Sequence, residues 1–338
     1  RLVMVFNGEI YNHFELRNKL ANDGHKIRWN GTSDSETLIN IISVYGLEKV
    51  LPKLRGMFAF AIWDLLDKKL FLVRDRFGEK PLYWGFSNNS SNCDLIFASE
   101  ISSFLENKSF KKSLNQKAID YYKTFGWIPA PLSIYKNVFQ LEPGTFLEIE
   151  SKNNFFCKSN LSHPNKWWSI SDTKNQKSSL VVGKKTEDIL YQIEDLLKKA
   201  IVSQSISDVK LGTFLSGGID SSLLTAILNS TYRDKISALT VSFSNSSKQE
   251  GIFDESMHAE KIANYLSLDH VKIELSQEEA ISNIPKLSNI YSEPFADSSQ
   301  LPSILLCEVA KNYGLSVALS GDGGDELFGG YNRYKYAP

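Results

Sequence analysis

Leu211-Gly-Thr-Phe-Leu-Ser-Gly-Gly-Ile-Asp-Ser-Ser-Leu-Leu-Thr-Ala-Ile-Leu228 is a stretch that predicts a buried strand, a glycine turn and a helix. Leu211 to Leu215 are mostly apolar, which suits a short strand covered on both faces. Ser216-Gly217-Gly218 predicts a tight turn, in which two glycines let the backbone approach a ligand closely. A helix opening at Ser221 and Ser222 then turns four apolar residues toward a sheet: Leu223, Leu224, Ile227 and Leu228.

The turn between this strand and this helix suits a phosphate group. A helix N-terminus presents unpaired N–H groups and the positive end of the helix dipole. Asp220 lies inside the cradle, where its carboxylate would repel phosphate unless a cation intervened, so the sequence predicts Mg²⁺ there. The spacing does not fit the lysine-containing loop of P-loop NTPases. It resembles the Ser-Gly-Gly-x-Asp-Ser pyrophosphate loop of ATP pyrophosphatases, which cleave ATP between the α- and β-phosphates.

The composition argues against several classes of protein. The 338 residues allow two domains or one large one, and a hydrophobic content of 42% suffices for sizeable cores. A net charge of −1 argues against nucleic acid as a partner, and no apolar run approaches the roughly 20 residues that span a membrane. Cys93, Cys157 and Cys307 lack any paired spacing, which favours a reducing compartment, so we expect a cytoplasmic protein.

Both ends of the sequence are abrupt. It begins at Arg1 without a methionine and runs directly into an apolar stretch, and it stops equally suddenly at Pro338. We therefore expect a fragment that lacks both ends of a longer protein.

Residues 1–155 are predicted to form a first domain with many short strands and few helices. Helices are expected at 12–22 and 34–45. Strands are expected at 2–6, 57–63, 69–74, 82–86, 95–98 and 145–150. Asn7-Gly8-Glu9 is expected as a polar turn after the first strand. This pattern predicts an α+β antiparallel sandwich.

Residues 156–185 are rich in Ser, Asn and Lys and are predicted as a linker. From Thr186, which can cap a helix, strands and helices alternate through 186–338. Strands are expected at 211–215, 236–243, 270–275 and 315–319, and further helices at 255–266, 277–291 and 301–313. Strict alternation predicts an α/β domain with a doubly wound parallel sheet.

A second glycine-rich loop, Ser320-Gly-Asp-Gly-Gly-Asp-Glu326, follows the last expected strand. Ligands of open parallel sheets bind outside the carboxyl ends of the strands, so this loop and the first can face one pocket. Asp325 with Asp220 could bind Mg²⁺ on pyrophosphate, whereas Asp322 would lie nearer the acceptor. The simpler alternative for this loop is a solvated acidic turn at a helix start.

The two loops, at 216–222 and 320–331, resemble those of glutamine-hydrolysing asparagine synthetases. The resemblance implies a set of ATP-binding residues: Leu215, Ser216, Gly217, Gly218, Asp220, Ser221, Val241, Ser320 and Gly321. It also implies that Asp322 serves formation of a β-aspartyl-AMP intermediate, and that the segment Glu293 to Ser299 lines the aspartate pocket. The family's catalytic lysine would lie beyond residue 338.

Asn7-Gly-Glu-Ile-Tyr-Asn12 resembles the corresponding motif of class II glutamine amidotransferases, whose fold is of the N-terminal nucleophile hydrolase type. Amide hydrolysis needs donors for an oxyanion, which the Asn7 amide and the Gly8 N–H can supply. By the resemblance, Glu9 and Asp34 bind the ammonium group of glutamine. Asp34 could instead simply cap a helix. The nucleophilic cysteine of the family is absent from position 1, so it is expected upstream.

The sequence thus predicts an enzyme that makes asparagine from aspartate, ATP and glutamine, with Mg²⁺ and through β-aspartyl-AMP, releasing AMP and pyrophosphate. Self-association into a homodimer is compatible with this reading of the sequence. Two alternatives keep the architecture: amidation of another carboxylate, such as a sugar acid of a surface polysaccharide, or closure of a β-lactam ring. A third alternative is a non-catalytic scaffold or regulator, against which the acids at 220, 322 and 325 argue.

Overall fold

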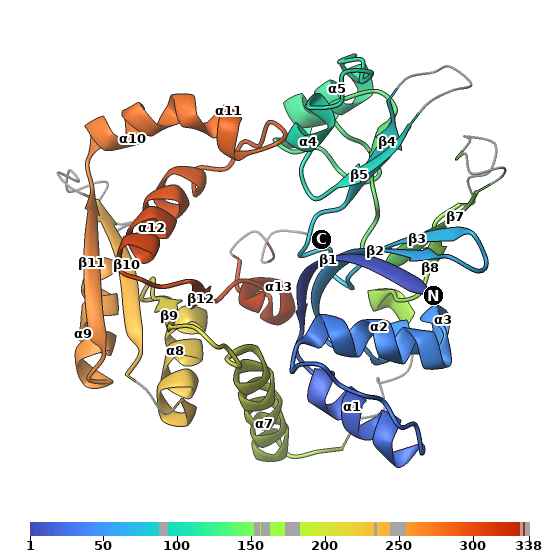
Figure 1. The fold of residues 1–338 in the computed structure, drawn as a ribbon. Coiled ribbons are helices and arrows are strands. Elements are labelled where there is room, and N and C mark those ends of the chain that lie inside the picture. Colours follow the sequence, from blue (N-terminus) through green and yellow to red (C-terminus); the bar gives the residue numbers. More distant parts are fainter. Residues whose placement is uncertain are drawn as a thin grey trace. The chain divides into compact units, whose positions relative to one another are not determined.

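The computed structural model describes residues 1–87, 94–151, 156, 163–172, 183–232, 235–243, 255–331 and 334. Cys93 and Cys157 lie outside these residues. The chain forms two compact units (Figure 1). The first contains Arg1–Val182 and Ser288–Ala296, and the second contains Gly183–Leu287 and Asp297–Pro338.

Two antiparallel sheets build the first unit. The larger has the order β1 (Leu2–Ile10), β2 (Gly56–Asp64), β3 (Lys69–Arg74), β7 (Thr145–Glu150) and β8 (Asn165–Lys166). The smaller has the order β5 (Leu95–Ala98), β4 (Tyr83–Phe86) and β6 (Val138–Gln140). The predicted antiparallel sandwich is therefore confirmed.

The larger sheet is covered on both faces. Helices α1 (His13–Asn22) and α2 (Asp34–Tyr45) pack on one face, where Leu38 and Ile41 meet Phe58 and Phe60 of β2. On the other face, residues of β2, β3 and β7 pack against Trp84 and Phe86 of the smaller sheet. Successive side chains along each strand point to opposite faces of the sheet, so alternate residues belong to the two apolar layers.

The first strand is longer than predicted. β1 continues through Asn7, Gly8 and Glu9 to Ile10, so the prediction of a polar turn there was wrong. Gly8 lies opposite Phe58, and a Cβ at Gly8 would overlap the Met57 carbonyl, so only glycine permits this close pairing. Cross-strand pairing with β2 overrides the local turn preference of Asn-Gly.

Several elements of the first unit were not predicted. They are α3 (Leu47–Val50), a 3₁₀ turn at Leu51–Lys53, α4 (Ser102–Leu105), α5 (Gln116–Phe125), β6 and β8. β8 falls inside the predicted linker, and the neighbouring Trp167 stacks on Phe58 with ring centroids 6.2 Å apart. That segment therefore contributes to the core of the first unit.

The second unit contains one parallel sheet, in the order β11 (Asp269–Leu275), β10 (Ser237–Phe243), β9 (Leu211–Phe214) and β12 (Val317–Leu319). Helices α8 (Ile219–Thr231) and α9 (Ser256–Tyr265) share one apolar layer through Leu268. Helix α12 (Gln300–Asn312) packs on the opposite face against Leu239 and Ile273. This arrangement confirms the predicted doubly wound parallel sheet.

The helices of the second unit differ from prediction in local detail. α7 (Thr186–Gln204) has Lys185 at its N-cap position, without a side-chain cap, and Thr186 is its first helical residue. α8 begins at Ile219 and leaves Leu223 exposed. The helix expected at 277–291 is broken into α10 (Gln277–Asn283), a 3₁₀ turn and α11 (Leu287–Ile290). Pro285 lies in the 3₁₀ turn, where it cannot donate a helical hydrogen bond.

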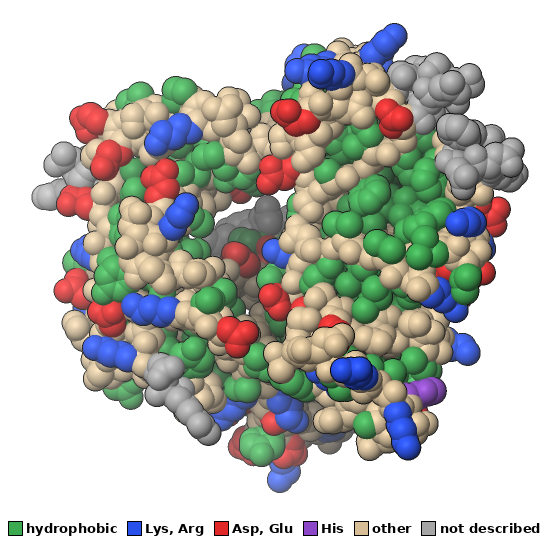
Figure 2. Space-filling model, viewed as in Figure 1, with side chains coloured by type: hydrophobic (Ala, Val, Ile, Leu, Met, Phe, Trp, Pro, Cys, Tyr) green, Lys and Arg blue, Asp and Glu red, His purple; other side chains and the backbone are tan. Residues whose placement is uncertain are grey.

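The surface carries charges of both signs. Lysine and arginine side chains alternate with aspartate and glutamate over the face that Figure 2 displays, in keeping with the net charge of −1. Within the described residues, no helix combines the length and apolar character needed to cross a membrane.

Asp75 organises the loop that joins β3 to β4. The residue is fully buried, and its carboxylate accepts five backbone N–H groups at 2.7–3.2 Å: those of Phe58, Phe77, Gly78, Glu79 and Lys80. The neighbouring Arg74 donates to the carbonyl oxygens of Gly78, Lys80 and Leu141. A buried acid and a buried base thus fix opposite sides of one turn.

We predict that Asp75→Asn lowers the free energy of unfolding of the first unit by roughly 2–4 kcal/mol, because an amide loses part of this acceptor capacity. All six tryptophans precede residue 183, so tryptophan fluorescence during denaturation reports on the first unit alone. Asp67→Asn, at an exposed turn, is the matched control and should change the transition little. An Asp75→Asn transition as small as that of the control would contradict the prediction.

Candidate functional sites

The first candidate site lies along the edge of β1. Asn7 and Glu9 are exposed on one face of the strand, and the Asn7 amide donates to Ser99 Oγ at 2.9 Å. The Tyr11 N–H donates to Arg55 beside β2, so strand alternation directs the N–H groups of Gly8 and Ile10 away from β2. No strand in the described ranges pairs with that edge. The Gly8 N–H therefore points to the same side of the strand as the Ile10 N–H.

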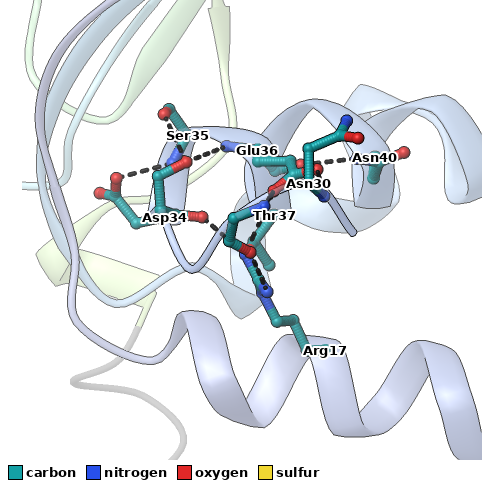
Figure 3. A network of polar contacts seen from close by, with 9 residues as sticks. Arg17, Asn30, Asp34, Ser35, Glu36, Thr37 and Asn40 are labelled. Carbon is teal, nitrogen blue, oxygen red and sulfur yellow. Dashed lines mark hydrogen bonds and ion pairs between the residues drawn. The ribbon is translucent and has the colours of Figure 1, made fainter. Parts of the chain in front are cut away.

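Asp34 lies at the same edge. One carboxylate oxygen accepts the Ile10 N–H at 2.8 Å. The other accepts the Ser35 N–H at 2.6 Å (Figure 3). Residues two apart on a strand are separated by about 7 Å, so Asp34 lies that far along the edge from the Gly8 N–H. The separation is comparable to that between the ammonium and side-chain amide groups of an extended glutamine. The structure therefore brings Gly8 and Asp34 to one edge, with Asn7 and Glu9 on the same strand.

Ser33, not Asp34, caps α2. The Ser33 hydroxyl oxygen accepts the Glu36 N–H at 3.2 Å, and Asp34 is the first helical residue. Arg17 reaches from α1 to Thr37 in the first turn, as Figure 3 shows. The simple capping role considered for Asp34 was therefore wrong, because the preceding serine already fills it.

His13 and Tyr11 near this edge are partly buried. Burial lowers the pKa of His13, whose Nδ1 lacks a hydrogen-bond partner among the described residues. Burial and the neighbouring acids Glu79, Glu9 and Asp75 raise the pKa of Tyr11 to about 12. Both side chains are therefore uncharged at neutral pH.

The second candidate site lies where the strand order of the parallel sheet reverses. The chain proceeds from β9 through β10 to β11 and then returns to the other side of β9 for β12. The loops after β9 and β12 consequently flank the switch point, which is the usual ligand position in open α/β sheets. The first loop leads from Leu215 to Gly218 into α8, whose first turn holds Asp220 and Ser221. The second loop leads from Ser320 to Gly323 into α13 (Gly324–Phe328), whose first turn holds Asp325.

The first loop is held by its own hydroxyl groups. Ser216 Oγ accepts the Gly218 N–H at 3.2 Å and lies 2.9 Å from Ser221 Oγ, which accepts the Ser216 N–H at 3.2 Å. Gly217 has a φ of +91°, and a Cβ there would come within 2.8 Å of the backbone at the start of α9. Glycine is therefore required for the shape of this turn.

Two glycines let the loops approach each other. A Cβ at Gly324 would overlap the Asp220 carboxylate, and a Cβ at Gly321 would come within 2.8 Å of the Ser221 N–H nitrogen. The pKa of Asp220 is raised by burial first and then by the negative charges of Asp325 and Glu326. Acids from both loops thus lie close enough to repel each other, as the sequence predicts for a shared cation.

These acids fit Mg²⁺ held jointly with a phosphate ligand. No cluster of three or more histidine, cysteine, aspartate or glutamate side chains suited to a metal occurs in the described part of the chain. Mg²⁺ in nucleotide sites typically uses one or two carboxylates together with substrate phosphates and water. Asp220 and Asp325 satisfy that smaller requirement.

The remaining predicted residues lie around the same loops. Leu215 is buried directly before the first loop, and Val241 is half-buried on the adjacent β10. Asp322 is exposed and accepts a hydrogen bond from the Ser320 hydroxyl at 2.7 Å. Asp322 is therefore directed back along its own loop in this structure.

Glu293 has an anchoring role that the sequence does not reveal. Its carboxylate accepts the Ile134 N–H at 2.5 Å, the Gln140 amide at 3.0 Å and the Tyr83 hydroxyl at 3.1 Å, all within the first unit. Burial raises the pKa of Glu293. The segment expected to line the aspartate pocket is thus divided, since Asp297 onward belongs to the second unit. Nothing in the sequence near Glu293 signals these partners.

Comparison with protein families matches both halves of the chain. Residues 1–161 match the glutamine amidotransferase domain, and residues 192–338 match asparagine synthase. A solved glutamine phosphoribosylpyrophosphate amidotransferase from B. subtilis is 14% identical, with 80% of this chain and 45% of that chain covered. The TM-score of that match is 0.31.

Two relatives match nearly the whole chain. Bacillus subtilis asparagine synthetase (glutamine-hydrolyzing) 1 is 33% identical over 332 residues, 98% of this chain and 48% of the relative. A Methanocaldococcus jannaschii protein, provisionally named asparagine synthetase (glutamine-hydrolyzing) 2, is 33% identical over 336 residues, 98% of this chain and 59% of the relative. The chain thus spans about half the length of these relatives. It belongs to the glutamine-hydrolysing asparagine synthetase family, with a glutamine amidotransferase domain preceding an asparagine synthase domain.

Proposed function

We propose that the protein containing this chain makes asparagine from aspartate, ATP and glutamine. The aspartate side-chain carboxylate attacks the α-phosphorus of ATP, which forms β-aspartyl-AMP and releases pyrophosphate. Ammonia from glutamine then attacks the acyl carbon, and AMP leaves with one carboxylate oxygen. Activation is necessary because a carboxylate is a poor acyl donor to ammonia at neutral pH, whereas AMP is a good leaving group.

The first unit is proposed to hydrolyse glutamine. The Gly8 N–H and the Asn7 amide would donate to the oxyanion of the amide carbon, and Glu9 and Asp34 would bind the substrate ammonium. The open edge of β1 supports this role, because it presents the Gly8 N–H and Asp34 in one direction. We place the glutaminase domain at residues 1–155.

The second unit is proposed to form the adenylate. Ser216, Gly217, Gly218 and Ser221 would bind pyrophosphate, while Leu215, Val241, Ser320 and Gly321 would contact ATP. Mg²⁺ on Asp220 and Asp325 would neutralise charge on the phosphates. Asp322 would act at the acceptor end. We place this synthetase domain at residues 186–338.

The observation that carries this proposal is the convergence of both glycine loops at the reversal of strand order, where the charges of Asp220 and Asp325 interact. The test is product analysis of the full-length protein supplied with Mg-ATP, glutamine and a panel of carboxylic acids. We expect aspartate to be the one acid of the panel that reacts, and its products to be AMP, pyrophosphate and asparagine. Turnover of a sugar acid or β-lactam formation instead of asparagine would overturn the assignment of the acceptor.

We predict that Asp220→Asn and Asp325→Asn each abolish ATP–pyrophosphate exchange, because the cation between the acids and the phosphates is lost. Glutamine hydrolysis by the same variants should remain, because its proposed residues lie in the first unit. Glu308→Gln, an exposed acid on α12, is the control and should exchange normally. Near-normal exchange in both aspartate variants would remove the metal role.

A second prediction concerns Asp34→Asn. Asparagine retains an acceptor for the Ile10 N–H but loses the charge that would bind an ammonium. We expect the KM for glutamine to rise roughly 10- to 100-fold while ammonia-dependent asparagine synthesis stays unchanged. An unchanged glutamine KM would show that Asp34 serves only to join β1 to α2.

A further inference from the structure

Thr240 on β10 links the strand before the pyrophosphate loop to a histidine. Its hydroxyl oxygen is 2.6 Å from the Leu215 carbonyl oxygen and 2.9 Å from Nε2 of His270 on β11. The carbonyl can only accept, so the single hydroxyl proton is donated to Leu215. Nε2 of His270 must then carry a proton and donate it to Thr240. The contacts therefore form a directed relay from His270 through Thr240 to Leu215.

The relay ends on the peptide group that opens the loop. The Leu215 carbonyl and the Ser216 N–H belong to one planar peptide unit. Thr240 holds the carbonyl end, and Ser221 Oγ accepts the N–H at the other end at 3.2 Å. The Leu215 N–H also donates to the Leu239 carbonyl at 2.9 Å. The plane of this peptide, and hence the direction in which the loop leaves β9, is fixed at both ends.

Water cannot easily replace the relay. Thr240 is 2% exposed and Leu215 is 1% exposed, so a carbonyl without the hydroxyl would remain buried and unpaired. Burial also lowers the pKa of His270, which favours the neutral ring at neutral pH. The three residues belong to the second compact unit and come from three adjacent strands or their ends.

We propose that Thr240 and His270 are positioning residues for ATP, which orient the 215–216 peptide so that the loop N–H groups face the phosphates. They act through Leu215 and do not themselves contact the nucleotide. The proposal rests on the proposed function, because it requires the loop to bind ATP.

The test uses the full-length protein and Mg-ATP titrated by calorimetry. Thr240→Val keeps the branched shape but removes the hydroxyl, and we expect the Kd for Mg-ATP to rise roughly 5- to 50-fold. In ATP–pyrophosphate exchange, the KM for ATP should rise more than kcat falls. Thr240→Ser retains the hydroxyl and should restore both values. His270→Leu leaves the Thr240–Leu215 hydrogen bond in place, so its effect should be smaller.

Ser237→Ala is the matched control. Ser237 is buried near the start of the same strand, away from the loop, and its hydroxyl donates to Asp269 at 3.0 Å. It should lower the thermal midpoint without changing the Kd for Mg-ATP. If Thr240→Val and His270→Leu behave like this control, the relay is only structural and the inference is wrong. If the parent protein does not bind Mg-ATP at all, the proposed function fails, and the inference fails with it.

Discussion

The close approach of two loops at the reversal of strand order is the constraint on which the second site depends. Gly324 lies against the Asp220 carboxylate, and Gly321 lies against the backbone of Ser221. Any side chain at either glycine would force the loops apart. Burial first, and then the neighbouring acids Asp325 and Glu326, raise the pKa of Asp220. The repulsion between these acids is one that a divalent cation can relieve. The site is thus shaped for a ligand that carries both a cation and an anion.

The first site uses a different property of the backbone. An unpaired strand edge exposes N–H groups, which proteins usually protect because such edges associate with other strands. Here Asp34 takes the Ile10 N–H, and Gly8 leaves another N–H directed toward the same edge. The edge can therefore serve as a set of oriented donors. Asp75 stabilises the neighbouring loop by accepting five N–H groups. One of them belongs to Phe58 of β2, the strand with which β1 pairs.

Local rules account for the features that the sequence predicts well. Alternating apolar strands and amphipathic helices predict the parallel sheet, and two glycine-rich loops after strands predict the position of the second site. Features that depend on distant partners were missed. Pairing with β2 extends β1 through Asn7 to Ile10. Trp167, which lies in the expected linker, stacks on Phe58 in the core of the first unit. The partners of Glu293 and the relay from His270 to Leu215 join residues without any motif between them.

The central claim is that the two loops support transfer of AMP to a carboxylate. Its most direct test is oxygen tracing with the full-length protein, Mg-ATP, glutamine and aspartate labelled with ¹⁸O in the side-chain carboxylate. An acyl-adenylate requires that one labelled oxygen leave with AMP when ammonia attacks the acyl carbon. The account therefore predicts ¹⁸O in the phosphate group of AMP, together with unlabelled pyrophosphate. Formation of ADP and labelled phosphate, or of AMP without label, would contradict it.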